Sequence, residues 1–171
     1  LETWFSANDP GSAPAHAWTD PALDTSAWKT MTVPGLWEDA GEPELNGVVW
    51  FRKTLDLPAG VADVPGELHL AMVDDVDTTW VNGVQVGTTT GYNVVRKYHV
   101  PAGVLKEGRN VIAVRVLDTG GGGGIWGEER VGLFVRRKTA PLAVELSGPW
   151  QYRIGMELRD GPWPPVSWTG D

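Results

Sequence analysis

The feature that most constrains the fold of this chain is a period of two in its apolar residues, clearest in the run 48–57. Val49, Phe51, Leu55 and Leu57 share one face of this run, and most of its polar residues lie on the other. A period of two predicts a β-strand, because successive side chains of a strand point to opposite faces. No window of eleven or more residues carries a convincing helical stripe, so the pattern favours an all-β fold.

Further alternating runs follow at short spacing. Asn82-Gly83 lies between the alternating runs 79–81 and 84–86, a pattern typical of a two-residue β-hairpin because both turn residues tolerate positive φ. We expect the other strands around 68–72, 98–100, 111–117, 133–135, 142–146 and 150–154. About eight strands joined by short turns predict a β-sandwich, of the jelly-roll type.

The two ends of the chain lack this alternation. Residues 1–45 are rich in Pro, Asp, Ala and Trp, and we expect an irregular segment here. Its tryptophans, Trp4, Trp18, Trp28 and Trp37, are expected to pack it onto a sheet. The predicted jelly-roll domain covers 1–155, and 156–171 is expected to be a Pro- and Trp-rich extended tail or linker.

The composition of the chain limits the kinds of binding partner that it can have. The length of 171 residues suits one domain, and the formal net charge of −8 disfavours binding to nucleic acid and to anionic polysaccharides. No apolar run is long enough for a membrane helix, and with no cysteines there is no thiolate metal site. Ten tryptophans against three Phe and three Tyr suggest flat faces for sugar rings. Because the chain opens at Leu1 without Met or a signal peptide, we expect a piece of a larger protein.

Three blocks in order carry a resemblance to a known family. They are DDVDTTWVNGVQVG (74–87), GYNVVRKYHVPAGVLKEGRNVIAVRV (91–116) and DTGGGGGIWG (118–127). Together with the segments 26–38 and 47–58, they resemble the galactose-binding-like jelly-roll domain of sialate O-acetylesterase-like enzymes. A looser form of the pattern is similar to the sugar-binding domain of family 2 glycoside hydrolases, such as β-galactosidases and β-glucuronidases. The resemblance implies a galactose-binding-like sandwich.

The resemblance also bears on catalysis. In those esterases the chemistry lies in a separate SGNH hydrolase domain, with a Gly-Asp-Ser block and an Asp-x-x-His block, and neither block occurs here. We therefore expect no enzymatic activity in this chain. The resemblance implies an ancillary domain of a secreted or periplasmic bacterial esterase or glycosidase, with carbohydrate and the parent's catalytic domain as its partners.

Three carboxylates crowd the start of the second block. Asp74, Asp75 and Asp77 repel one another unless hydrogen-bond donors or a cation hold them. One interpretation is a sugar site, a second is a calcium site, and a third is structural pairing with Arg96 or Arg115. No other metal and no cofactor is expected.

Aromatic and amide groups follow close by. Tyr92 offers a stacking face, and Asn93 and Arg96 offer hydrogen bonds to vicinal hydroxyls, although a turn with an Arg salt bridge is the alternative. Trp126 follows five glycines, 120–124, and an exposed indole there is a platform for a pyranose; the alternative is a loop that docks on the missing catalytic domain. The predicted ligand-binding residues are Asp75, Asp77, Tyr92, Asn93, Arg96 and Trp126.

The sequence thus predicts a non-catalytic carbohydrate-binding module that contacts poly- or oligosaccharide through the loops at one end. The alternative is a structural insertion that packs on an SGNH acetylesterase domain and has no affinity for sugar of its own.

Overall fold

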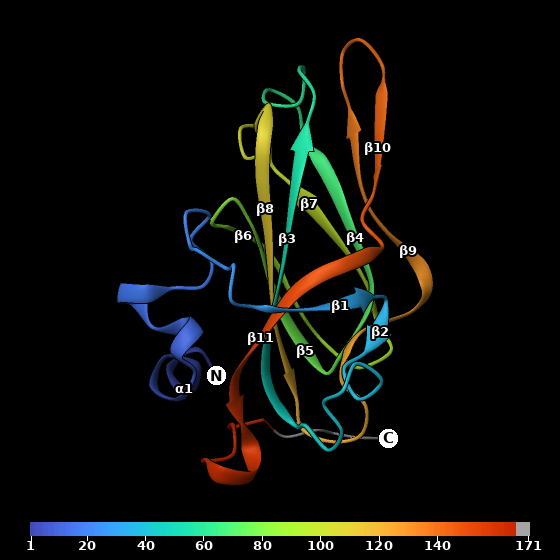
Figure 1. Ribbon diagram of the computed structural model, residues 1–171. Helices are drawn as coiled ribbons and strands as arrows, with labels where there is room; N and C mark the ends of the chain where they lie inside the picture. Colours follow the sequence, from blue (N-terminus) through green and yellow to red (C-terminus); the bar gives the residue numbers. More distant parts are fainter. Residues whose placement is uncertain (167–171) are drawn as a thin grey trace.

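The alternating segments form strands in the computed structural model, which describes residues 1–166 (Figure 1). The elements are α1 (Glu2–Asn8), η1 (Pro10–Ser12), η2 (Pro14–His16), β1 (Lys29–Val33), β2 (Gly35–Leu36), β3 (Gly47–Leu57), β4 (Gly66–Asp74), β5 (Val76–Val81), β6 (Val84–Thr90), β7 (Val95–Val100), β8 (Gly108–Asp118), β9 (Gly124–Arg136), β10 (Pro141–Glu145), β11 (Gly148–Glu157) and η3 (Leu158–Asp160).

The strands form two antiparallel sheets packed face to face, so the predicted all-β sandwich is confirmed. The six-stranded sheet has the order β1-β11-β3-β8-β5-β6, and the other has the order β10-β9-β4-β7, with β2 paired to β9. The chain crosses between the sheets at each step from β3 to β5 and from β6 to β9, as in jelly rolls. The main core fills the space between the inner faces, where Phe51, Leu68, Val114 and Leu133 are buried.

The predicted hairpin is present. Val81 pairs with Val84, and the turn residues Asn82 and Gly83 have φ of 49° and 79°. Two positive φ angles are what a two-residue hairpin turn of this kind requires.

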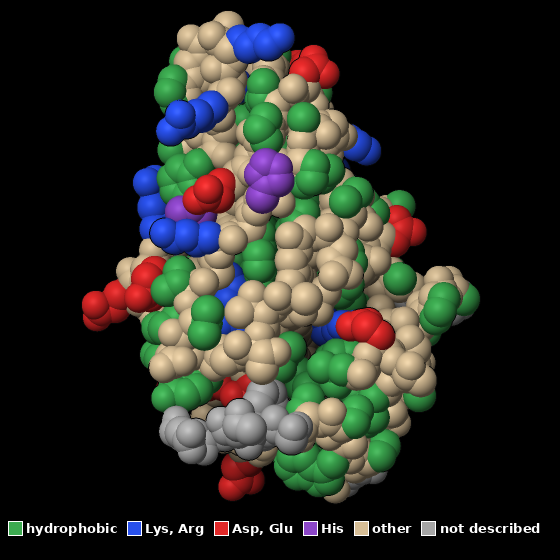
Figure 2. All heavy atoms as spheres, turned by 180° about the vertical axis from the view of Figure 1, so that it is seen from behind, with side chains coloured by type: hydrophobic (Ala, Val, Ile, Leu, Met, Phe, Trp, Pro, Cys, Tyr) green, Lys and Arg blue, Asp and Glu red, His purple; other side chains and the backbone are tan. Residues whose placement is uncertain are grey.

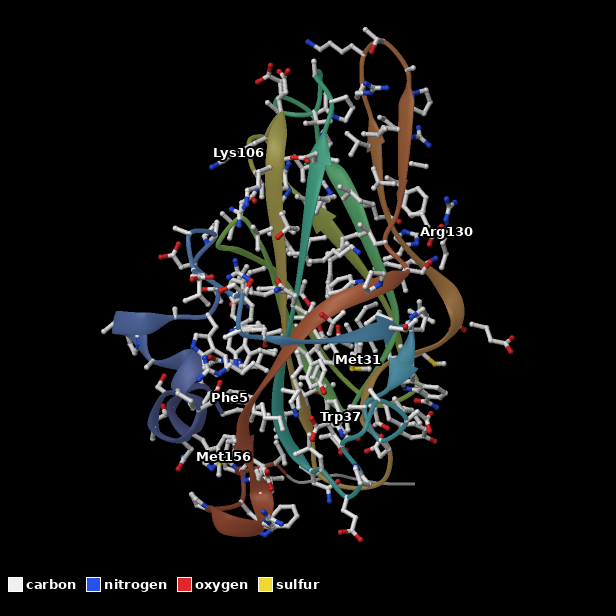
Figure 3. The ribbon with its side chains drawn as sticks, viewed as in Figure 1. Phe5, Met31, Trp37, Lys106, Arg130 and Met156 are labelled. Atoms are coloured by element: carbon white, nitrogen blue, oxygen red, sulfur yellow. The ribbon has the colours of Figure 1, made fainter. Side chains whose placement is uncertain are left out.

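A second apolar cluster covers the outer face of the six-stranded sheet. Phe5, Trp18 and Trp28 of the N-terminal segment pack there against Trp50 and Leu117. In Figure 3, Phe5 and Met156 lie on the α1 side of the molecule, whereas Met31 and Trp37 lie on the other side of the β11 ribbon. The expectation that tryptophans pack this segment onto a sheet is confirmed: Trp18 and Trp28 lie in this outer layer with the partly buried Trp4, and Trp37 lies in the main core.

The segment expected to be irregular also contains regular structure. α1 forms at its start, and β1 pairs with β11 from Lys29↔Tyr152 to Val33↔Gly148. At the other end, β11 continues to Glu157, which pairs with Gly47, so the strand enters the region expected to be a tail. Residues 167–171 of that tail lie outside the described part. Within 1–166, no helix has the length and apolarity needed to cross a membrane.

Candidate functional site

The ends of five strands meet at one end of the sandwich, the lower end in Figure 1. Val76 at the start of β5 pairs with both Leu117 of β8 and Thr90 of β6, and Asp74 at the end of β4 pairs with Gly124 of β9. The β4–β5 turn, the β6–β7 loop and the β8–β9 loop are therefore neighbours. All the predicted ligand-binding residues lie on or beside these three connections.

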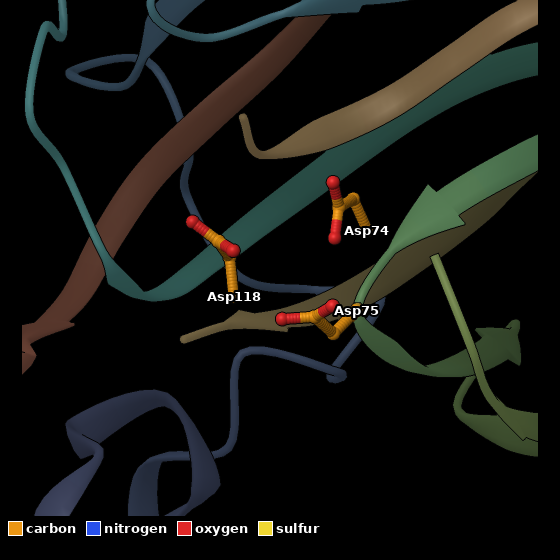
Figure 4. Close-up of side chains that lie close together, drawn as sticks. All are labelled: Asp74, Asp75 and Asp118. Atoms are coloured by element: carbon orange, nitrogen blue, oxygen red, sulfur yellow. The ribbon is translucent and has the colours of Figure 1, made fainter. Parts of the chain in front are cut away.

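Asp74, Asp75 and Asp118, here called the carboxylate cluster, converge at this end (Figure 4). Each offers an oxygen, and these oxygens lie within 4.8 Å of one another. Asp75 Oδ2 accepts hydrogen bonds from Thr119 N at 3.0 Å and Thr119 Oγ1 at 3.2 Å. Asp118 is fully buried, and its Oδ1 accepts from Gly120 N at 3.0 Å, while its Oδ2 has no hydrogen-bond partner in the described part of the chain.

The crowding changes the acidity of the cluster. Burial raises the pKa of Asp118 to about 9, and the charges of Asp74, Asp75 and Glu38 act in the same direction. Burial also raises the pKa of Asp74 to about 8, reinforced by a hydrogen bond and the charge of Asp75. The site therefore disfavours having all of its carboxylates ionised near neutral pH without a positive charge among them.

The glycine-rich β8–β9 loop lies close against the segment after β2. Trp37 N donates to Gly123 O at 3.0 Å, and Gly123 N donates to the Glu38 carboxylate at 3.2 Å. A Cβ on Gly123 would lie only 1.9 Å from the Trp37 ring, which explains a glycine there. Glu38 is thereby held beside the cluster, a neighbour that the sequence analysis did not identify.

Trp126 is joined to the backbone of Tyr92 next to the cluster, and the two residues are here called the Tyr92–Trp126 pair. The indole Nε1 of Trp126 donates to the backbone oxygen of Tyr92 at 2.9 Å, and Gly91 N donates to Asp75 O at 2.8 Å. The Tyr92 side chain is 54% exposed, Asn93 is exposed, and Trp126 is half-buried. The structure thus brings together Asp75, Tyr92, Asn93 and Trp126 as predicted, although the indole is less exposed than expected.

Asp77 and Arg96 do not share this surface. Both side chains are fully buried, and Arg96 Nε donates to Asp77 Oδ1 at 2.7 Å. Arg96 also donates to the backbone oxygens of Gly91 and Val94, which fixes the β6–β7 loop. The structural ion pair, one of the alternatives considered for these residues, is the arrangement observed. Because the pair is buried, neither side chain can contact a ligand at the surface.

The third member of the carboxylate cluster is Asp118, whereas the sequence suggested Asp77. Asp77 points into the sandwich, where Tyr98 Oη and Thr79 Oγ1 donate to it. Asp118 comes from a distant block of the sequence, and its only sequence signal is a carboxylate placed between a buried strand and a glycine run.

A groove lies on the outer face of the smaller sheet, a face that carries basic and histidine side chains (Figure 2). This groove of about 520 Å³ is lined by Glu67, His99, Phe134 and Arg136 among others. The phenyl ring of Phe134 is already in contact with His69 at 4.7 Å and with the Arg130 guanidinium at 4.8 Å between centres. The groove therefore offers a poorer stacking face than the Tyr92–Trp126 pair.

Fold and site together define an all-β sandwich domain that gathers carboxylates and aromatic rings at one end. A family model described as the β-galactosidase second all-β domain matches residues 13–122, and the chain belongs to this family.

Individual relatives are larger glycosidases. A β-galactosidase of Arthrobacter sp. (strain B7) is 25% identical over 120 residues, which cover 56% of this chain and 12% of that protein. A β-glycosidase from Bacteroides vulgatus superposes with a TM-score of 0.55 at 23% identity, over 70% of this chain and 18% of that one. A β-glucuronidase from Bacteroides uniformis gives a TM-score of 0.52 at 24% identity, over 78% of this chain and 15% of that one. The two structures support the fold, and the chain spans less than a fifth of each relative.

These findings confirm the broader part of the resemblance, the relation to the all-β domains of glycoside hydrolases. They give no support to its narrower part, the relation to SGNH esterases.

Proposed function

We propose that this chain is a non-catalytic, carbohydrate-binding accessory domain of a larger glycoside hydrolase. Membership of the β-galactosidase second all-β domain family supports a glycosidase rather than an esterase as the parent. The acidic composition favours neutral sugars as ligands, since it repels anionic polysaccharides.

The observation that carries this proposal is the Tyr92–Trp126 pair. An aromatic ring binds a pyranose by stacking under its C–H face, and a ring held in place loses little freedom on binding. The hydrogen bond from Trp126 Nε1 to Tyr92 O fixes the indole against the β6–β7 loop. The half-buried carboxylate of Asp75 and the exposed amide of Asn93 lie on neighbouring connections, and in this proposal they bond to sugar hydroxyls.

The carboxylates do not form a glycosidase acid–base pair in this proposal. Such a pair flanks a scissile bond from two sides of an open cleft. Asp118 has no exposed surface, and its oxygen lies within 4.8 Å of those of Asp74 and Asp75, on the same side of any ligand. We therefore assign bond cleavage to a catalytic domain elsewhere in the parent protein.

Calorimetric titration of the 171-residue chain with neutral oligosaccharides tests the proposal. We expect saturable binding with a Kd on the order of 10 µM to 1 mM, because shallow wet sites leave little net affinity. Trp126→Ala should weaken binding at least tenfold, whereas Trp163→Ala, at an indole that is 65% exposed in the segment after η3, should not. Equal losses in both variants, or no binding to any neutral glycan, would contradict the proposal.

A second candidate function is docking on the parent's catalytic domain. It is favoured by the exposed apolar side chains beside Tyr92, since Val94 is 43% and Val95 is 37% exposed. In that case the isolated chain binds no glycan, and Val94→Ser weakens its association with the separately expressed catalytic domain of the parent.

A further inference from the structure

The carboxylate cluster contains a buried oxygen that has no partner among residues 1–166. Asp118 has no exposed surface, and its Oδ2 accepts no hydrogen bond from these residues, although Oδ1 is bound by Gly120 N. Buried polar atoms are nearly always paired, because an ionised carboxylate loses its hydration on burial. An unpaired oxygen at this depth calls for a ligand that replaces the lost water.

The surroundings of Asp118 are acidic rather than neutralising. Asp74 and Asp75 bring oxygens within 4.8 Å, and Figure 4 shows the three carboxylates around a common space. The charge of Glu38 also acts on Asp74 and Asp118. Like charges at such distances repel unless a cation lies among them or some of the groups stay protonated.

Arg96 is a cation near the cluster, but its N–H donors bind other groups. Its Nε donates to Asp77, its Nη1 donates to the backbone oxygens of Gly91 and Val94, and its Nη2 donates to those of Asp75 and Thr89. A guanidinium has five N–H donors, so these five bonds use all of them. Arg96 therefore has no donor left for the carboxylates of the cluster.

The spacing of the oxygens is compatible with a shared calcium ion. Calcium binds oxygens at about 2.3–2.6 Å, so ligands on opposite sides of the ion lie about 4.6–5.2 Å apart. Oxygens that lie within 4.8 Å of one another can therefore contact one such ion together. Magnesium gives up its water ligands reluctantly and is seldom bound by protein carboxylates alone, which favours calcium here. Asp74 and Asp75 are half-buried, which leaves an entry path and room for water ligands.

From this geometry we propose that Asp74, Asp75 and Asp118 form a calcium-binding site. Asp74 ends β4 in one sheet and Asp118 ends β8 in the other, so the ion bridges the two layers of the sandwich. It also stabilises the β4–β5 turn, on which the Tyr92 loop rests through the bond from Gly91 N to Asp75 O. The site needs no glycan, so it stands or falls independently of sugar binding.

Calorimetry on the EGTA-treated 171-residue chain, without sugar, tests this proposal. We expect one Ca²⁺ to bind per chain, the melting temperature to rise with Ca²⁺ up to about 10 mM, and Mg²⁺ to bind at least tenfold more weakly. Terbium, a luminescent ion of similar ligand preference, should show emission sensitised by tryptophan that excess Ca²⁺ reverses.

Two variants and a matched control locate the site. Asp118→Asn and Asp75→Asn should each weaken Ca²⁺ binding at least tenfold, whereas Asp56→Asn, at an exposed carboxylate on β3, should bind as the unmodified chain does. Asn keeps the shape of Asp118 and its acceptor for Gly120 N, and circular dichroism checks that each variant folds. Absence of Ca²⁺ binding up to about 10 mM, equal binding of Mg²⁺, or unchanged affinity in both cluster variants would overturn the proposal.

Discussion

The Asp77 carboxylate lies 2.7 Å from Arg96 Nε in a region where neither side chain touches solvent. This pair links β5 of the larger sheet to β7 of the smaller one. Arg96 also donates a hydrogen bond to a backbone oxygen of the β6–β7 loop. One ion pair thus connects the interior of the sandwich to the loop that presents Tyr92.

Removing one partner of this pair should be severely destabilising. We expect Asp77→Ala to lower the free energy of unfolding by about 3–5 kcal/mol, because Arg96 would be left as an uncompensated buried charge. Urea denaturation followed by tryptophan fluorescence measures the change. The exposed Asp63 supplies the control, and Asp63→Ala should change stability by less than about 0.5 kcal/mol. A loss below about 1 kcal/mol in Asp77→Ala would show that the pair is not what holds this region.

The carboxylate cluster should make stability fall as pH rises. The folded-state pKa values of Asp74, about 8, and Asp118, about 9, lie above the unfolded value near 4. Between these limits the folded chain holds protons that the unfolded chain has released, so the free energy of unfolding decreases with increasing pH. We expect the melting temperature in EGTA to decline from pH 5 to pH 9.

The same pH series provides its own control. Asp118→Asn should flatten the decline and raise the melting temperature at pH 8, because the uncharged amide removes the repulsion. Asp56→Asn should leave the slope unchanged, since that carboxylate is exposed. A profile for Asp118→Asn identical to that of the unmodified chain would contradict the raised pKa of Asp118.

Two glycines of the β8–β9 loop should respond differently to alanine. Gly123→Ala places a methyl group 1.9 Å from the Trp37 ring, and we expect a loss of about 1–3 kcal/mol from forced repacking. Gly120→Ala meets nothing within 4 Å and should stay within about 0.5 kcal/mol of the unmodified chain. Thermal melts compare the two, and similar effects would mean that the loop does not pack against Trp37 as described.

Phe5 should anchor the N-terminal segment. Its ring lies 3.6 Å from the guanidinium carbon of Arg115 and is buried in the outer apolar cluster. Phe5→Ala should cost about 3–5 kcal/mol, as for other large apolar deletions. Thr3→Ala, at an exposed position of the same helix, is the control. Proteolysis before residue 29 should become faster only in Phe5→Ala; resistance equal to the control would argue against this anchoring.

The sandwich itself could be predicted from sequence because strand alternation is a local signal. Val49, Phe51 and Leu55 face the core as expected, and Asn82-Gly83 makes the expected turn. Arg52 and Arg115 show where local reasoning stops. Both are buried, because a third layer formed by the N-terminal segment covers their face of the sheet. The alternation of residues within a strand cannot predict that a distant segment will cover one face of the sheet.

The site was predictable only in part for a similar reason. Asp75, Asp77, Tyr92 and Arg96 lie within two short blocks, so sequence reasoning placed them together, yet it could not tell which of them face inward. Asp77 follows Asp75 by two residues on an extended strand, which suggests a common face, but Asp75 lies in the turn before β5 and is outside that alternation. Asp118 joins the cluster through the β5–β8 pairing, a contact that only the folded sheet provides.

The layer that Phe5, Trp18 and Trp28 build over the six-stranded sheet has a practical consequence for anyone who trims this polypeptide. A shortened chain that begins at β3 would expose Trp50 to solvent. It would also lack the carbonyl oxygens of Trp18 and Asp20, which accept hydrogen bonds from Arg52. Such a product would expose this apolar face to water and should aggregate. The stretch that looks most dispensable in the sequence therefore shields one side of the sandwich from solvent.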